Sequence, residues 1–82
     1  TTAETPTLSV EEQRRVLDFI LEVNAKRLPV VVGLAGNDTA ALCRRIGAFD
    51  LNGVEAVLSA CPHYNKPTQE GLIAHFTAVA DA

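Results

Sequence analysis

Residues 30–38, VVVGLAGND, decide the fold, because a short apolar run is followed at once by a polar loop that contains glycine. The run is rich in β-branched residues and shows no alternation of apolar and polar side chains. This pattern is typical of a parallel strand that is buried on both faces. Asn37 or Asp38 can cap a helix that follows, and Gly36 permits a close approach of the backbone. The stretch therefore predicts a strand, a loop and the start of a helix.

A second unit of the same kind lies further along the chain. The apolar run at residues 56–60, AVLSA, is followed by the loop at 61–67, CPHYNKP, and a helical pattern begins at about Thr68. Between the two runs, residues 39–49 place three large apolar side chains on one helix face. Before the first run, Ser9 and Glu12 form the sequence signature of a capping box, which predicts a helix from Ser9 to about Lys26.

These elements predict an α/β fold with a parallel sheet, built from neighbouring βα units. The polar loops at Gly36 and Tyr64 then leave the carboxyl ends of their strands, the edge at which α/β proteins build their sites. No linker divides residues 1–82, so we expect a single segment of one domain. Two strands leave open sheet edges, and we expect further chain or another protomer to cover them.

Composition and charge disfavour several classes of function. The chain has 82 residues, of which 48% are hydrophobic and 21% charged, a globular composition. Its net charge of −3 disfavours nucleic acid and anionic membranes as partners, and no apolar run approaches the roughly 18 residues of a membrane span. Cys43 and Cys61 fit free thiols of a cytoplasmic protein better than a disulfide. No Cys/His spacing suggests a metal site, and His75 is expected to be a surface or packed residue.

The loop at residues 61–67 is the strongest candidate for chemistry. Pro62 and Pro67 restrict its backbone, and such a loop can aim the side chain of Tyr64. A phenol is both a donor and an acceptor of hydrogen bonds, so it can pass a proton without carrying a permanent charge. The alternative is a rigid turn in which Tyr64 only packs.

Residues 62–71, PHYNKPTQEG, closely resemble the segment PYYNKP(S/T)QEG of the dihydrodipicolinate synthase and N-acetylneuraminate lyase family, in its synthase branch. Residues 1–4, TTAE, look like the TTGE signature of that family, and residues 27–33 and 36–37 fit between the two motifs at the expected spacing. The resemblance covers nearly the whole chain. It implies a partial TIM (βα)8 barrel that runs from the end of strand two to helix four, and a complete barrel has about 250 residues.

The resemblance also implies an activity that needs no cofactor. In the family, a lysine forms a Schiff base with pyruvate, and the enamine attacks aspartate 4-semialdehyde to give 4-hydroxy-tetrahydrodipicolinate in lysine (diaminopimelate) biosynthesis. By position, Thr1 and Tyr64 are members of the proton relay, and Thr2 binds the pyruvate carboxylate. The Schiff-base lysine and a second relay tyrosine lie downstream in the family and are not in this chain. The equivalent of Tyr64 reaches into a neighbouring subunit, which implies a homodimer or homotetramer.

Three positions depart from the relatives that lysine inhibits. Asn37 and His63 match positions of the allosteric pocket at the dimer interface, but His63 replaces a tyrosine. Ala41 stands where such relatives carry a glutamate for the ammonium group of the effector, and Val10 stands where many carry histidine. Losing a carboxylate removes the charged partner for a cation, so we expect weak or absent feedback by lysine.

Two other readings stay open at this point. Within the family, the chain could belong to a 2-keto-3-deoxy-sugar acid aldolase or an N-acetylneuraminate lyase, although the run at residues 65–71 favours the synthase. In a different class, it could be a non-catalytic α/β module that oligomerises through its open sheet edges. Assays with both kinds of substrate and the mass of the intact protein separate these readings.

Overall fold

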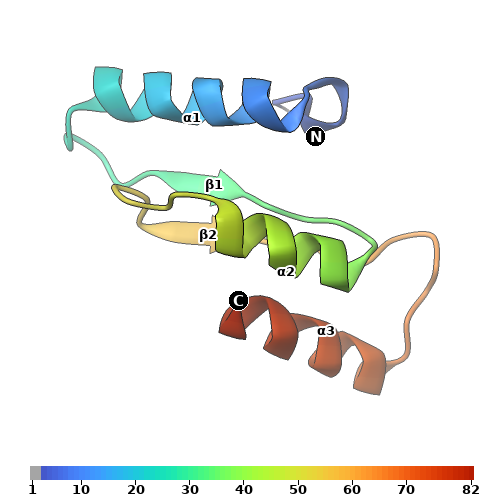
Figure 1. Cartoon of the computed structure of the whole chain (residues 1–82). Helices are drawn as coiled ribbons and strands as arrows, with labels where there is room; N and C mark the ends of the chain where they lie inside the picture. Colours follow the sequence, from blue (N-terminus) through green and yellow to red (C-terminus); the bar gives the residue numbers. More distant parts are fainter. Residues whose placement is uncertain (1–2) are drawn as a thin grey trace.

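The structure is a computed structural model that describes residues 3–82. Three helices and two short strands follow one another in the order that the sequence predicts (Figure 1). A 3-10 turn precedes them. The elements are η1 (Thr5–Thr7), α1 (Val10–Asn24), β1 (Val31–Gly33), α2 (Thr39–Ala48), β2 (Ala56–Leu58) and α3 (Gln69–Asp81).

The two strands form a parallel sheet, as predicted. Val32 lies opposite Val57 in the register, and the ladder is extended by the Leu34 amide, which donates to the Leu58 carbonyl at 3.0 Å. In Figure 1, α1 lies above the strands, α2 in front of them and α3 below them, and each helix runs back against the strand direction. Both strands therefore end in loops at the same end of the sheet, and after each loop the chain returns through a helix.

The core lies between the sheet and α2. Leu34, Leu42 and Ile46 are buried together. Partly buried apolar side chains pack around these three, namely Val32, Phe49, Leu51 and Val79. The helix face predicted for residues 39–49 is therefore the face that packs, and Val79 joins α3 to the same core.

The expectation that both faces of the strands are buried is wrong for this chain. Val31 is 56% exposed and Leu58 is 69% exposed. The reason is that a two-stranded sheet with helices on it leaves apolar side chains of the strands without a covering layer. A run of β-branched residues is typical of a strand that is covered on both faces in a complete sheet. The two strands of this chain form only part of such a sheet.

Local capping interactions start all three helices. The amide of Ser9 donates to the Glu12 carboxylate at 2.7 Å, and the Glu12 amide donates to Ser9 Oγ at 3.2 Å, so the predicted capping box is present. Asp38, and not Asn37, caps α2 by accepting from the Ala41 amide at 2.9 Å. Thr68 caps α3 in the same way. The α1 helix ends at Asn24, two residues before the predicted end.

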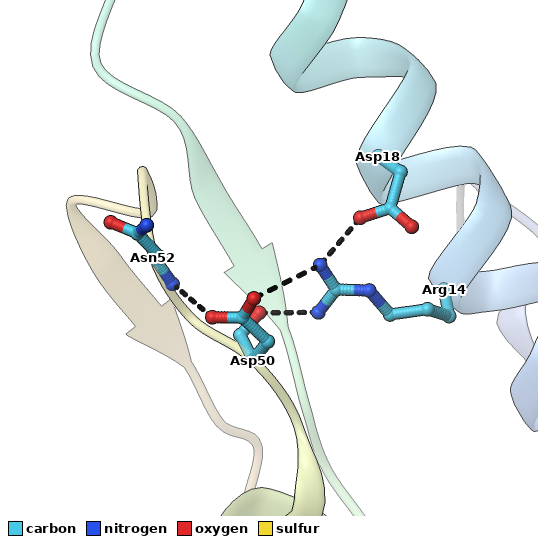
Figure 2. A network of polar contacts seen from close by, with 4 residues as sticks. All are labelled: Arg14, Asp18, Asp50 and Asn52. Atoms are coloured by element: carbon cyan, nitrogen blue, oxygen red, sulfur yellow. Dashed lines mark hydrogen bonds and ion pairs between the residues drawn. The ribbon is translucent and has the colours of Figure 1, made fainter.

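Arg14 connects α1 to the segment between α2 and β2 (Figure 2). Its guanidinium donates to the Asp18 carboxylate and to the Asp50 carbonyl, and it lies 3.9 Å from Asp50 Oδ2. The same group stacks on the Phe49 ring, 5.2 Å from the ring centroid. The hydrogen bond with Asp18 raises the pKa of Arg14 above its usual value. These contacts attach α1 to the segment that links α2 and β2.

A buried polar contact joins α2 to α3. A hydrogen bond of 2.7 Å connects Thr39 Oγ1 and His75 Nδ1, and His75 is only 4% exposed. The packed alternative for this histidine is therefore confirmed.

Arg45, on the last turn of α2, is half-buried rather than fully solvated, and its Nε and Nη2 atoms have no hydrogen-bond partner among the described residues. Among residues 3–82, no helix is both long and apolar enough to cross a membrane.

Candidate active site

The candidate site lies at the carboxyl ends of β1 and β2. The loop between β1 and α2 carries Asn37, and the loop between β2 and α3 carries His63 and Tyr64. Both loops lie at the end to which the strand arrows point in Figure 1, and so does η1. The predicted placement of these polar loops at one edge of the sheet is confirmed.

Tyr64 has an unusual backbone conformation. Its φ angle is 68°, and the Asn65 amide donates to the His63 carbonyl at 2.8 Å. A hydrogen bond between residues i and i+2 around a central φ near +75° defines the rare and strained form of the γ-turn. Lys66, two residues later, also has a positive φ of 48°. Side chains other than glycine seldom adopt such angles, and they persist where the surroundings fix them.

The phenol of Tyr64 is open to solvent. The residue is 94% exposed, whereas Pro62 in the same loop is buried. The alternative of a tyrosine that packs within this chain is therefore wrong. The buried proline and the γ-turn together present the phenol outward from the sheet edge, where it is free to contact another molecule or another part of the protein.

Asn37 joins the two loops. Its side-chain oxygen Oδ1 accepts a hydrogen bond of 2.9 Å from the backbone amide of His63. The sequence singled out both residues as positions of a possible allosteric pocket, and the structure brings them together. The bond itself was not predicted from the sequence, because its partners are 26 residues apart and an Asn side chain at a strand end has many possible partners.

Thr1 and Thr2 lie outside the described residues. Their predicted roles, as a member of the proton relay and as the group that binds the pyruvate carboxylate, therefore stay predictions. The segment that follows them, η1, is at the same end of the sheet as the Tyr64 loop. Residues 3–82 contain no group of three or more His, Cys, Asp or Glu side chains arranged to bind a metal ion.

An apolar groove between α1 and β1 reaches η1 at Thr5 but does not include the Tyr64 loop. Val16, Leu17 and Ile20 of α1 line one wall, and residues 30–34 line the other. Tyr64, His63 and Asn37 are not among its lining residues. The groove contains few polar groups and therefore offers little to a reaction that moves protons.

Cys43 and Cys61 are free thiols, as predicted, and lie in α2 and in the Tyr64 loop.

Comparison with known proteins identifies the family. The model of the dihydrodipicolinate synthetase family matches residues 1–82, the full length of the chain. The chain belongs to the dihydrodipicolinate synthetase family. Among its relatives, the 4-hydroxy-tetrahydrodipicolinate synthase of Cytophaga hutchinsonii is 52% identical over 81 residues, which is 99% of this chain and 27% of that protein. The one from Azobacteroides pseudotrichonymphae is 45% identical over 82 residues. The chain therefore spans between a quarter and a third of the length of these relatives.

Solved structures of the dihydrodipicolinate synthetase family share the fold. The structure of the chloride-inhibited dihydrodipicolinate synthase from Acinetobacter baumannii in complex with pyruvate matches 99% of this chain and 28% of that chain. The TM-score is 0.89 and the identity 42%. The structure from Aquifex aeolicus gives a TM-score of 0.84 at 39% identity, over 98% of this chain and 27% of that one. The predicted fold, part of a TIM barrel, is confirmed.

Proposed function

We propose that the whole protein to which this chain belongs is a 4-hydroxy-tetrahydrodipicolinate synthase. It condenses pyruvate with aspartate 4-semialdehyde in lysine biosynthesis, in the cytoplasm. Support comes from the family match over residues 1–82 and from relatives that carry this name. The observation that carries the proposal is the Tyr64 loop. Its sequence closely resembles the family motif, and its γ-turn presents an exposed phenol at the carboxyl ends of a parallel sheet, where barrel enzymes build their sites.

The proposed reaction needs proton carriers at this edge. The amine of a lysine outside this chain adds to the ketone carbon of pyruvate, and water leaves to give an imine. The imine loses a proton from its methyl carbon, and the resulting enamine forms a carbon–carbon bond with the aldehyde carbon, whose oxygen takes up a proton. Groups that give and accept protons accelerate such steps by about 10²- to 10⁴-fold. We assign this role to the Tyr64 phenol and the Thr1 hydroxyl, and the binding of the pyruvate carboxylate to Thr2.

The exposure of Tyr64 supports a homo-oligomer. A proton carrier needs a fixed position relative to the substrate, yet the Tyr64 side chain is 94% exposed in this chain. We therefore propose that the phenol enters the site of a neighbouring subunit in a homodimer or homotetramer. There, residues of the second subunit would fix its orientation and exclude water.

Two measurements on the full-length protein test this function. Reduction with borohydride in the presence of pyruvate should attach one pyruvate to the Schiff-base lysine, and mass spectrometry detects the adduct. The second measurement is the rate of condensation with aspartate 4-semialdehyde. A protein that forms no adduct, or that cleaves sugar acids and does not condense aspartate 4-semialdehyde, would contradict the proposal. An intact mass near 8.7 kDa for the folded protein from its source would instead favour the non-catalytic module.

Replacing the relay residues tests their roles within the proposed reaction. Tyr64→Phe removes only the hydroxyl group, and we expect kcat to fall by about 10²-fold with the pyruvate adduct retained. Thr1→Val should lower kcat as well. If the two residues belong to one relay, the double variant loses little more than either single one. Fully additive losses would show that Thr1 and Tyr64 act independently.

A further inference from the structure

The loop between β1 and α2 is fixed on both sides of Asn37. Before it, Leu34 is 1% exposed and its amide continues the sheet ladder. After it, Asp38 caps α2, and Thr39 is bonded to the buried His75 of α3. Asn37 is therefore an exposed side chain on a rigid backbone, because its neighbours are attached to the sheet, to α2 and to α3.

The γ-turn at Tyr64 needs such an external support. A positive φ angle at a residue other than glycine costs free energy, and here Tyr64 and Lys66 both have one. The hydrogen bond that closes the γ-turn uses the carbonyl of His63. The amide of the same residue is bonded to Asn37 Oδ1 at 2.9 Å. The residue before Tyr64 is thus fixed through both of its backbone polar groups, one within the turn and one from the neighbouring loop.

We propose that Asn37 is a positioning residue for Tyr64. By accepting from the His63 amide, it stabilises the γ-turn and thereby sets the direction in which the phenol leaves the sheet edge. Asn37 does not touch the phenol and takes no part in proton transfer itself. The inference rests on the proposed function for the role of Tyr64, but the link between Asn37 and the turn is structural and is testable without activity.

The first test measures the loop directly. In the full-length protein, Asn37→Ala should lower the protection of the loop at residues 61–67 in hydrogen–deuterium exchange read by mass spectrometry. Because one hydrogen bond contributes a modest net stabilisation, its loss should make exchange at the His63 amide about fivefold faster. Asn37→Asp keeps an acceptor oxygen in place and should restore most of the protection. Unchanged exchange in Asn37→Ala would overturn the proposal, whatever the protein catalyses.

The second test measures the reaction. We expect Asn37→Ala to lower kcat by about 5- to 10-fold and to leave the KM for pyruvate and the pyruvate adduct unchanged, because pyruvate binds elsewhere. Asn37→Asp should recover most of the rate. Asn52→Ala is the matched control. Asn52 is an exposed asparagine in the loop before β2, at the other end of the sheet, and its replacement should change neither the rate nor the exchange of the loop.

A double variant shows whether Asn37 acts through Tyr64. In the Tyr64→Phe background, adding Asn37→Ala should lower kcat by less than about twofold, because the group that Asn37 positions is already absent. A full 5- to 10-fold loss in that background would overturn the proposal. So would equal rates for Asn37→Ala and Asn37→Asp. A wild-type protein that forms no pyruvate adduct would instead contradict the proposed function, and the exchange experiment would still decide the structural role of Asn37.

Discussion

Tyr64 combines a strained backbone with an exposed side chain. Its φ of 68° lies at the centre of a γ-turn, and the residue is 94% exposed. Strain of this kind tends to occur where function requires one side-chain direction. Buried Pro62 and the Asn37 bond to His63, both just before Tyr64 in the chain, explain how the loop keeps this conformation. The chemistry assigned to the phenol therefore depends on residues that do not react.

Ser9 provides a test of the capping box at the start of α1. In Ser9→Ala, the Glu12 amide loses its acceptor, and the free energy of opening the first turn should fall by about 1 kcal/mol. Hydrogen exchange at that amide should become about fivefold faster. Ser9→Thr keeps the hydroxyl and is the control. Exchange equal to that of the wild type in Ser9→Ala would contradict the capping role.

Ala41 underlies the prediction about feedback by lysine. The residue lies in the first turn of α2 and offers no charge to an ammonium group. In the full-length enzyme, we therefore expect no inhibition of condensation at micromolar lysine. Ala41→Glu adds the missing carboxylate and is the variant in which lysine sensitivity should rise. Strong inhibition of the unaltered enzyme at micromolar lysine would refute this prediction.

The contact between α2 and α3 depends on one polar pair within an apolar junction. His75 is 4% exposed, and its Nδ1 is bonded to Thr39 Oγ1. The other ring nitrogen, Nε2, has no hydrogen-bond partner among residues 3–82. A buried polar group that loses its last partner is costly. The pair therefore determines how firmly α3 is attached to α2, and through Asp38 and Asn37 it supports the loop at the sheet edge.

Thr39→Val tests this junction with a nearly isosteric change. The hydroxyl is lost, and the free energy of unfolding of the full-length protein should fall by about 1–3 kcal/mol, because buried His75 is left without its partner. Urea denaturation measures the change. Thr39→Ser retains the hydroxyl and should lose less stability. If Thr39→Val and Thr39→Ser are equally stable, the hydrogen bond contributes little to the junction.

At the scale of the whole molecule, the chain exposes side chains that a complete barrel would cover. Val31 is 56% exposed, Leu58 is 69% exposed and Ile73 is 68% exposed. The chain spans only 27–28% of the length of its relatives. Apolar strand faces and open sheet edges favour association with other chains. The 82 residues therefore have the local order of a barrel segment without the closure that makes a barrel stable.

This incompleteness predicts different behaviour for the segment and the full-length protein. Prepared alone, residues 1–82 should bind a hydrophobic dye and associate at micromolar concentration, because the apolar strand faces are open to solvent. The full-length protein should bind little dye. Analytical ultracentrifugation and dye fluorescence measure the two effects. Replacing Val31 and Leu58 with threonine in the segment should weaken association. A folded monomer of 8.7 kDa that binds no dye would contradict this prediction.

The sequence by itself determined the elements, their order and the family. The Ser9 capping box, the helix face of Leu42 and Ile46, and the parallel pairing of the two apolar runs were all predicted and are confirmed. Such features act between residues a few positions apart, or through the period of the pattern. They are therefore visible without coordinates. The motif at residues 62–71 is also a set of neighbouring residues, and it therefore marked the loop that carries Tyr64 without coordinates.

Only the tertiary structure decided how this loop is supported. The bond between Asn37 and His63 spans 26 residues, and the bond between Thr39 and His75 spans 36. Each of these polar side chains has many possible partners in the sequence, and the packing of the helices on the sheet selects one. The exposure of the strand faces was also decided at this level, because burial depends on the layers that surround a strand and not on the residues within it.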